Sequence, residues 1–235
     1  MATDIKAVVF DAYGTLFDVY SVRAAAEQLF PGHGDALAAL WRDKQIEYTH
    51  LRTLSGPRGE HYRPFWDITI DALRFATQRL GLSLSPVAEK RLMDEYTCLS
   101  SFPENIETLR RLRDNGLRLG ILSNGNPQML DIAVKSAGMK GLFEHVLSID
   151  VARKYKTSPE AYQLGTHAFG LSAGEMAFVS SNCWDAIGAT WFGYTTFWVN
   201  RGGLPLEQLG VTPHGMGRDL RDVVRFVAAR NTAPA

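Results

Sequence analysis

The sequence predicts an α/β fold in which a doubly wound parallel sheet carries an inserted block of helices. Short apolar runs alternate with longer helical patterns across the second half of the chain, which is typical of strands covered on both faces. Residues 18–100 interrupt this alternation with helical patterns alone. The length of 235 residues and the hydrophobic content of 46% are sufficient for one large core.

We expect five buried parallel strands, each a near-continuous apolar run. They cover residues 6–10, 117–122, 144–149, 175–180 and 195–199. Helices are expected at residues 103–116, 127–138, 159–170, 183–193 and 219–230. Helix starts are marked by Pro103, Pro127 and the pair Ser158-Pro159, and helix ends by Gly116 and Gly138. The repeated order of strand, helix and strand predicts a Rossmann-like sheet.

Residues 18–100 contain four helical stretches with no strand-like run between them. These stretches cover residues 21–30, 34–54, 64–82 and 85–99. Ser85 and Pro86 begin the last one as N-cap and first helical residue. We therefore expect a four-helix cap subdomain at residues 18–100, placed over a Rossmann-like core that residues 1–17 and 101–235 form together.

The composition argues against several classes of partner. The chain has 25 basic and 25 acidic residues, so no net field attracts a nucleic acid or an anionic membrane. No apolar segment reaches the length of a membrane span, and the first apolar run is too short for a signal peptide. Cys98 and Cys183 lie far apart without metal-ligand spacing, as expected for free thiols in a reducing cytosol. We expect a cytoplasmic protein.

Polar side chains follow four of the expected strands, at the point where each strand ends. Ligands of open α/β sheets bind at the carboxyl ends of the strands, where the strand order reverses. Any one of these polar segments could be a solvated loop or a helix cap, but their combination predicts a site at this edge of the sheet. The residues are Asp11 and Thr15, then Ser123 and Asn124, then Lys156, and finally Ser180, Asn182 and Asp185.

Four motifs in this order resemble the haloacid dehalogenase superfamily, and more narrowly its L-2-haloacid dehalogenases. They are FDAYGTLFD, LSNG, YK and FVSSNCWDAIGA, and the helical insertion with its segment WRDKQIEYTHLR extends the resemblance over almost the whole chain. The first-motif aspartate and threonine of the family fall on Asp11 and Thr15. The resemblance implies that the chain converts short L-2-haloacids to 2-hydroxyacids through a covalent ester on Asp11.

Phosphatases of the same superfamily are the main alternative. They carry a second acid two residues after the first, and further acids after the fourth strand help to hold Mg²⁺, which neutralises the phosphoryl charge. In this chain Tyr13 stands at the position of the second acid. In the fourth motif Asn182 stands among the first polar positions, so Asp185 is the acid that remains there. We therefore expect no metal ion and no cofactor, and a Mg²⁺-dependent phosphatase stays the alternative.

Arg42, in the insertion, matches the family arginine that receives the departing halide. A guanidinium about 4 Å from a developing anion, at an effective dielectric constant near 20, contributes about 4 kcal/mol. That energy corresponds to roughly a thousandfold in rate. The alternative is an ordinary surface arginine paired with Asp43 or Glu47.

The resemblance implies roles for the other polar residues as well. Lys156 would keep Asp11 ionised, and Asp185 would pair with Lys156 and help to position or activate the hydrolytic water. Side chains that would assist are Ser180, Asn182 and Tyr162. The substrate carboxylate would be seated by Ser123 and Asn124 with the amides of Ala12 and Tyr13. Lys156 could instead be a solvated lysine, and Asp185 an acid that favours a helix N-terminus.

An apolar wall and a second subunit complete the expectations. The wall would come from Ile46, Phe65 and Trp184, although the same residues could simply pack the cap against the core. The resemblance implies a haloacid substrate, a halide product and a homodimer. A catalytically inactive binding module is a further alternative. It is disfavoured by the joint presence of Asp11, Arg42, Lys156 and Asp185.

Overall fold

The computed structural model describes residues 4–56 and 58–232. Within this part of the chain, six parallel strands form one sheet in the order β3-β2-β1-β4-β5-β6. Their bounds are β1 Ala7–Phe10, β2 Arg118–Ser123, β3 His145–Ser148, β4 Met176–Ser180, β5 Thr195–Val199 and β6 Gly215–Gly217. The strand order reverses at β1, which pairs with β2 on one side and β4 on the other. This arrangement confirms the predicted α/β fold with a doubly wound sheet.

Strand β6 is the element that the sequence analysis missed. Its three residues are Gly-Met-Gly, so no apolar run marks them. The glycine at position 215 permits close packing, because a Cβ there would lie 2.6 Å from the ring of Phe226 in the last helix. Strand β6 therefore depends on a tertiary contact rather than on its own strand propensity.

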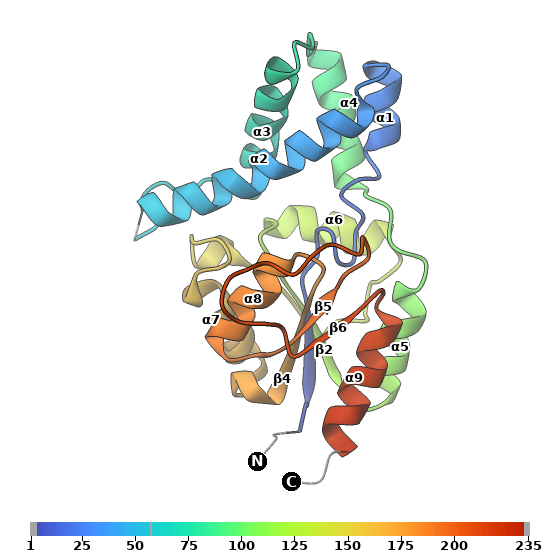
Figure 1. The fold of residues 1–235 in the computed structure, drawn as a ribbon, viewed down its shortest axis with the longest axis vertical. Helices are drawn as coiled ribbons and strands as arrows, with labels where there is room; N and C mark the ends of the chain where they lie inside the picture. The colour runs from blue at the N-terminus through green and yellow to red at the C-terminus, as the bar shows by residue number, and fades with distance from the viewer. Residues whose placement is uncertain (1–3, 57, 233–235) are drawn as a thin grey trace.

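Five further helices belong to the sheet part of the chain (Figure 1). They are α5 Asn105–Asp114, α6 Pro127–Ser136, α7 Pro159–Phe169, α8 Cys183–Phe192 and α9 Arg221–Thr232. Helix α5 precedes β2, and α6, α7, α8 and α9 follow β2, β3, β4 and β6. Ser158 caps α7 by accepting a hydrogen bond from the Ala161 amide, as its sequence predicts. Helix α5 begins at Asn105 and not at Pro103, because the amide of Asn105 bonds to the Phe102 carbonyl in a tight turn.

The four inserted helices lie together beyond the carboxyl end of the sheet, and α2 crosses above it (Figure 1). Their bounds are α1 Arg23–Leu29, α2 Gly34–Ser55, α3 Phe65–Arg79 and α4 Pro86–Thr97. Helices α2 and α3 are joined by a hydrogen bond of 2.8 Å from the Trp41 indole to the Thr69 carbonyl. Among the residues described, no helix combines the length and apolar character that a membrane span requires.

The two segments that connect these helices to the sheet run side by side. Phe17 and Ser101 form an antiparallel bridge, and the amide of Asp18 donates to the Ser100 carbonyl over 2.8 Å. The inserted helices are thus attached through one paired junction rather than through two independent linkers.

Candidate active site

Asp11 follows directly after β1, at the point where the strand order reverses. Its amide donates to the Val179 carbonyl of β4, and the residue is only 6% exposed. Three donors reach its carboxylate: Lys156 Nζ lies 3.0 Å from Oδ1, Thr15 Oγ1 lies 3.0 Å from Oδ2, and Asn182 Nδ2 lies 2.9 Å from Oδ2. The carboxylate is thereby fixed in orientation, with hydrogen bonds to both oxygens.

Lys156 lies between two carboxylates. Its ammonium is 3.0 Å from Asp11 Oδ1 and 3.0 Å from Asp185 Oδ2, and its side chain is 1% exposed. Burial alone would lower the pKa of Lys156, but the negative charges of Asp11 and Asp185 outweigh it and raise that pKa above its ordinary value. Lys156 is therefore a permanent cation and does not exchange protons near neutral pH.

Asp185, near the start of α8, is fully buried and receives a second hydrogen bond from Tyr162. The Tyr162 hydroxyl donates to Asp185 Oδ1 over 2.8 Å. Burial, reinforced by the charge of Asp11, raises the pKa of Asp185 to about 6, although Lys156 opposes the shift. Burial also raises the pKa of Tyr162 well above its usual range, so its hydroxyl stays a donor. The raised pKa of Asp185 thus brings its carboxyl close to the range in which it can gain or lose a proton near neutral pH.

Arg42, on α2, points from the inserted helices toward Asp11 and is 8% exposed. Its guanidinium donates to Gln45 Oε1 over 2.7 Å, to the Tyr13 carbonyl over 3.0 Å and to Asn182 Oδ1 over 3.2 Å. It does not pair with Asp43 or Glu47, which excludes the surface-arginine interpretation. Asn182 touches both Arg42 and Asp11, so it bridges the inserted helices and the sheet.

Tyr13 occupies the position of the second acid in the related phosphatases. Its ring is buried, and it stacks on Tyr96 with 5.8 Å between centroids and 13° between planes. Burial raises the pKa of the Tyr13 phenol well above its ordinary value, so the side chain stays uncharged. Among the described residues, no group of three or more His, Cys, Asp or Glu side chains could hold a metal ion.

A narrow cavity lies between the inserted helices and the sheet edge. Its volume is about 10 Å³, roughly room for one water. Most of the predicted substrate-binding residues line this cavity. The lining residues are Asp11, Tyr13, Arg42, Ile46, Thr49, Phe65, Ser123, Asn124, Asn182 and Trp184.

Ser123 and Asn124 end β2 on the wall of this cavity. Ser123 Oγ accepts the Gly125 amide over 3.0 Å, which leaves its hydroxyl hydrogen for another acceptor. Asn124 Oδ1 accepts the Lys156 amide over 3.1 Å and so ties two strand ends together. The backbone amides of Ala12 and Tyr13 find no acceptor within the described parts of the chain. Free donors of this kind suit an anionic ligand.

Ser180 lies behind the cavity wall, as do Lys156 and Asp185. Ser180 Oγ accepts the Asn182 amide over 3.1 Å. Its neighbour Ser181 contacts Thr15: the Ser181 backbone amide donates a hydrogen bond of 2.8 Å to the Thr15 hydroxyl oxygen. The sequence analysis also missed Gln45, although its position one helical turn after Arg42 was a usable signal.

Comparisons with known proteins place the chain in a family. A family model described as haloacid dehalogenase-like hydrolase matches residues 5–193. The chain belongs to the haloacid dehalogenase-like hydrolase family. An (S)-2-haloacid dehalogenase of Pseudomonas sp. strain YL is 46% identical over 222 residues, which cover 94% of each chain. The haloacetate dehalogenase H-2 of Moraxella sp. strain B is also 46% identical, over 89% of this chain and 92% of its own.

Solved structures of the same family share this fold. The crystal structure of the L-2-haloacid dehalogenase RSc1362 matches with a TM-score of 0.95 and 66% identity, and covers 97% of this chain and 100% of its own. The structure of the L-2-haloacid dehalogenase from Xanthobacter autotrophicus with chloropropionic acid covalently bound matches with a TM-score of 0.87 and 36% identity. It covers 97% of this chain and 100% of its own. The resemblance inferred from the motifs is confirmed.

Proposed function

We propose that this chain hydrolyses short L-2-haloacids to 2-hydroxyacids through a covalent ester on Asp11, without a metal ion. The observation that carries the proposal is the pairing of an oriented carboxylate with a buried guanidinium across one small cavity. The enzyme is a hydrolase acting on carbon–halide bonds, like the relatives it matches.

In the first step, an Asp11 oxygen attacks the α-carbon of the haloacid from the side opposite the halogen. The carbon–oxygen bond forms as the carbon–halogen bond breaks, so the centre inverts and a halide leaves with the bonding electron pair. Arg42 receives this anion in a site with little solvent, where its charge acts most strongly. Ser123 and the amides of Ala12 and Tyr13 hold the substrate carboxylate.

In the second step, water attacks the Asp11 carbonyl carbon and releases the 2-hydroxyacid. The negative charge that forms resides on the Asp11 oxygen that is not part of the ester bond. If this oxygen is Oδ1, Lys156 stabilises the charge; if it is Oδ2, Thr15 and Asn182 do so. Asp185 accepts one proton of the water and gives it to the alkoxide oxygen of the product as the bond between that oxygen and the Asp11 carbonyl carbon breaks. Tyr162 holds Asp185, and Ser180 orders the turn that carries Asn182.

The decisive experiment is halide release from L- and D-2-chloropropionate in the presence of a chelator. We expect release from the L form alone, at the same rate with and without chelator. Turnover of p-nitrophenyl phosphate that requires Mg²⁺, without halide release, would instead support the phosphatase alternative.

The pH dependence follows from Asp185. In the resting protein the pKa of its carboxyl lies near 6, in part because of the negative charge of Asp11. The ester on Asp11 is neutral, so the pKa of Asp185 falls below this value while the ester is present. Protonated Asp185 cannot accept the proton of the water, so we expect kcat to be constant near neutral pH and to fall in acid, at a pH below about 6. Alkylation of Asp11 does not need this step, so acid-quenched samples at pH 5 should contain more ester, as measured by mass spectrometry. A rate that stays constant down to pH 4.5 would contradict this role.

We also propose that residues 18–100 act as a cap over the catalytic core. The cavity takes walls from both parts, and with its present volume it has no room for a three-carbon acid. Ile46, Phe65 and Trp184 would contact the substrate side chain once the cap shifts. We further propose a cytoplasmic location, which the free thiols of Cys98 and Cys183 support.

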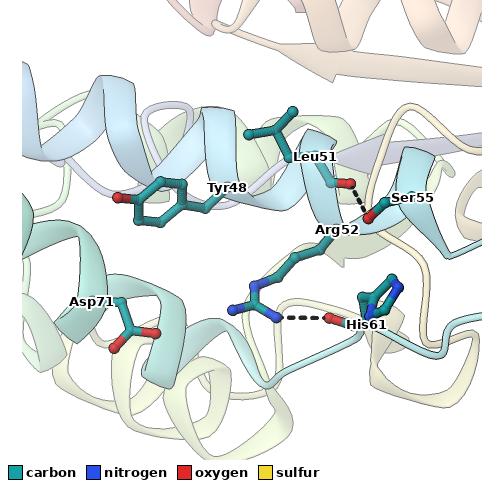
Figure 2. A pocket seen from close by; sticks show the side chains of 6 residues that line it. All are labelled: Tyr48, Leu51, Arg52, Ser55, His61 and Asp71. Carbon is teal, nitrogen blue, oxygen red and sulfur yellow. Dashed lines mark hydrogen bonds between the residues drawn. The ribbon is translucent and has the colours of Figure 1, made fainter.

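Finally, we propose that the enzyme is a homodimer. Leu51 and Leu54 of α2 are 53% and 80% exposed, and Leu51 lines a hollow of about 350 Å³ between α2 and α3 (Figure 2). Apolar patches of this kind favour self-association. We expect light scattering to give twice the chain mass for the wild type. The dimer should dissociate in Leu54→Glu but not in Leu204→Glu, where the replaced leucine is exposed in a loop and not on α2. A monomeric wild type would contradict the proposal.

A further inference from the structure

Gln45 is a fully buried glutamine on α2, one helical turn after Arg42, and it does not line the cavity. Its Oε1 accepts from Arg42 over 2.7 Å and from the Tyr96 hydroxyl over 3.0 Å. Its Nε2 donates to Thr69 Oγ1 over 2.6 Å. The Gln45 amide therefore connects α2, α3 and α4, and it contacts the Arg42 guanidinium without lining the cavity.

The orientation of this amide is fixed by the hydroxyl of Thr69. That hydroxyl donates its own hydrogen to the Phe65 carbonyl over 2.7 Å, so toward Gln45 it can only accept. The NH₂ group of Gln45 must then face Thr69, and the carbonyl oxygen must face Arg42. The carbonyl oxygen that accepts from Arg42 is thus oriented by Thr69 and, through it, by the Phe65 carbonyl.

The partners of Arg42 share one further property: they are all neutral. They are a side-chain amide, a backbone carbonyl and a second side-chain amide. Within the described residues, no carboxylate oxygen lies within 4.0 Å of its nitrogens. A buried arginine usually has a carboxylate partner, because desolvation of a charge is costly. Here the positive charge is kept without a counterion on the cap side of the cavity.

We propose that Gln45 is a positioning residue for the leaving halide: it holds Arg42 through a neutral acceptor and so leaves the positive charge of Arg42 available to the anion. The inference rests on the proposed dehalogenation. It explains why an uncharged amide, and not a carboxylate, occupies a position that touches a buried guanidinium.

Two variants separate this role from simple packing. Gln45→Glu keeps the size and an acceptor for Arg42 but introduces a counterion. Gln45→Met keeps the volume and loses the hydrogen bonds but adds no charge. If Gln45 served only to hold Arg42 in place, the glutamate should be the milder change. If it preserves the charge, the glutamate should be the more damaging one for halide binding.

The measurements are bromide inhibition of turnover and bromide binding to the resting protein, followed by tryptophan fluorescence because Trp184 lines the cavity. We expect the inhibition constant and the dissociation constant for bromide to be about tenfold or more higher in Gln45→Glu than in Gln45→Met, because a counterion weakens the attraction between Arg42 and the bromide ion. The ratio of kcat for bromo- over chloropropionate should also rise in Gln45→Glu, since the poorer leaving group needs the cation more. Gln163→Glu, which adds the same charge on an exposed face of α7, should match wild type.

The reverse order of the two variants, or equal bromide constants in wild type and Gln45→Glu, would overturn the inference. If Gln45→Glu does not fold, Thr69→Val tests the same role by releasing the amide orientation, and it should raise the bromide constant severalfold while Thr69→Ser does not. An unchanged constant in Thr69→Val would then overturn it. A wild type that binds bromide with this order of variants but releases no halide would reject the proposed function and keep the role of Gln45.

Discussion

Replacement of Asp11 by asparagine is expected to abolish halide release from L-2-chloropropionate, with kcat reduced by roughly 10⁴-fold or more. The amide is uncharged and is a poor nucleophile toward saturated carbon. The variant keeps the size of the side chain, but its single amide oxygen can accept either from Lys156 or from Thr15, because these two donors reach different oxygens of Asp11. Asp43→Asn, an exposed acid next to Arg42 in the sequence, serves as the control and should keep full activity.

The same residue allows a direct test of the ester. In water labelled with ¹⁸O, one turnover of wild-type enzyme should place the label in the Asp11 carboxylate, because water attacks that carbonyl carbon. The product should acquire label only in later turnovers. Mass spectrometry of the peptide that contains Asp11 measures this order. Label found in the product of the first turnover would mean that water attacks the substrate carbon itself.

Replacement of Lys156 by methionine is expected to remove activity and to lower the free energy of unfolding by about 3–5 kcal/mol at pH 8. Without the ammonium, the carboxylates of Asp11 and Asp185 are buried side by side with no cation between them. Lys135→Met, which removes an exposed lysine paired with Asp131, should cost less than about 1 kcal/mol.

The loss in Lys156→Met should shrink at lower pH. A carboxyl whose pKa is raised by folding adds stability below its unfolded pKa, and this stability is lost as the pH rises through the folded pKa. The pKa of Asp185 is already raised in the wild type, and removal of its cation raises it further. Urea unfolding at pH 5.5 and pH 8 measures the difference. An equal loss at both pH values would show that packing, and not charge, sets the cost.

The positions of Asp11 and Asp185 could be predicted from the sequence because Asp11 follows a buried strand and Asp185 lies in the first turn of a helix. Lys156 lies in the loop between β3, which is mostly not buried, and α7. Parallel strands bring their carboxyl ends to one edge, so the topology alone gathers these residues. The register was harder: Ser180 and Ser181 are adjacent, and only the structure tells which of them reaches Thr15.

The support of Arg42 could not be predicted in the same way. Gln45, Thr69 and Tyr96 come from three helices, and their hydrogen bonds depend on how those helices pack. Strand β6 was missed for a related reason, since Gly-Met-Gly has no pattern of its own. Local periodicity reports which elements form, whereas contacts between distant elements appear only in three dimensions.

The paired junction at Phe17 and Ser101 has a consequence for the timing of turnover. Asp11 belongs to the sheet and Arg42 to the helices beyond this junction, so the cap movement proposed above would also separate the attacking oxygen from the guanidinium. Under this proposal, we expect the carbon–halogen bond to break only once the helices have returned around the bound molecule.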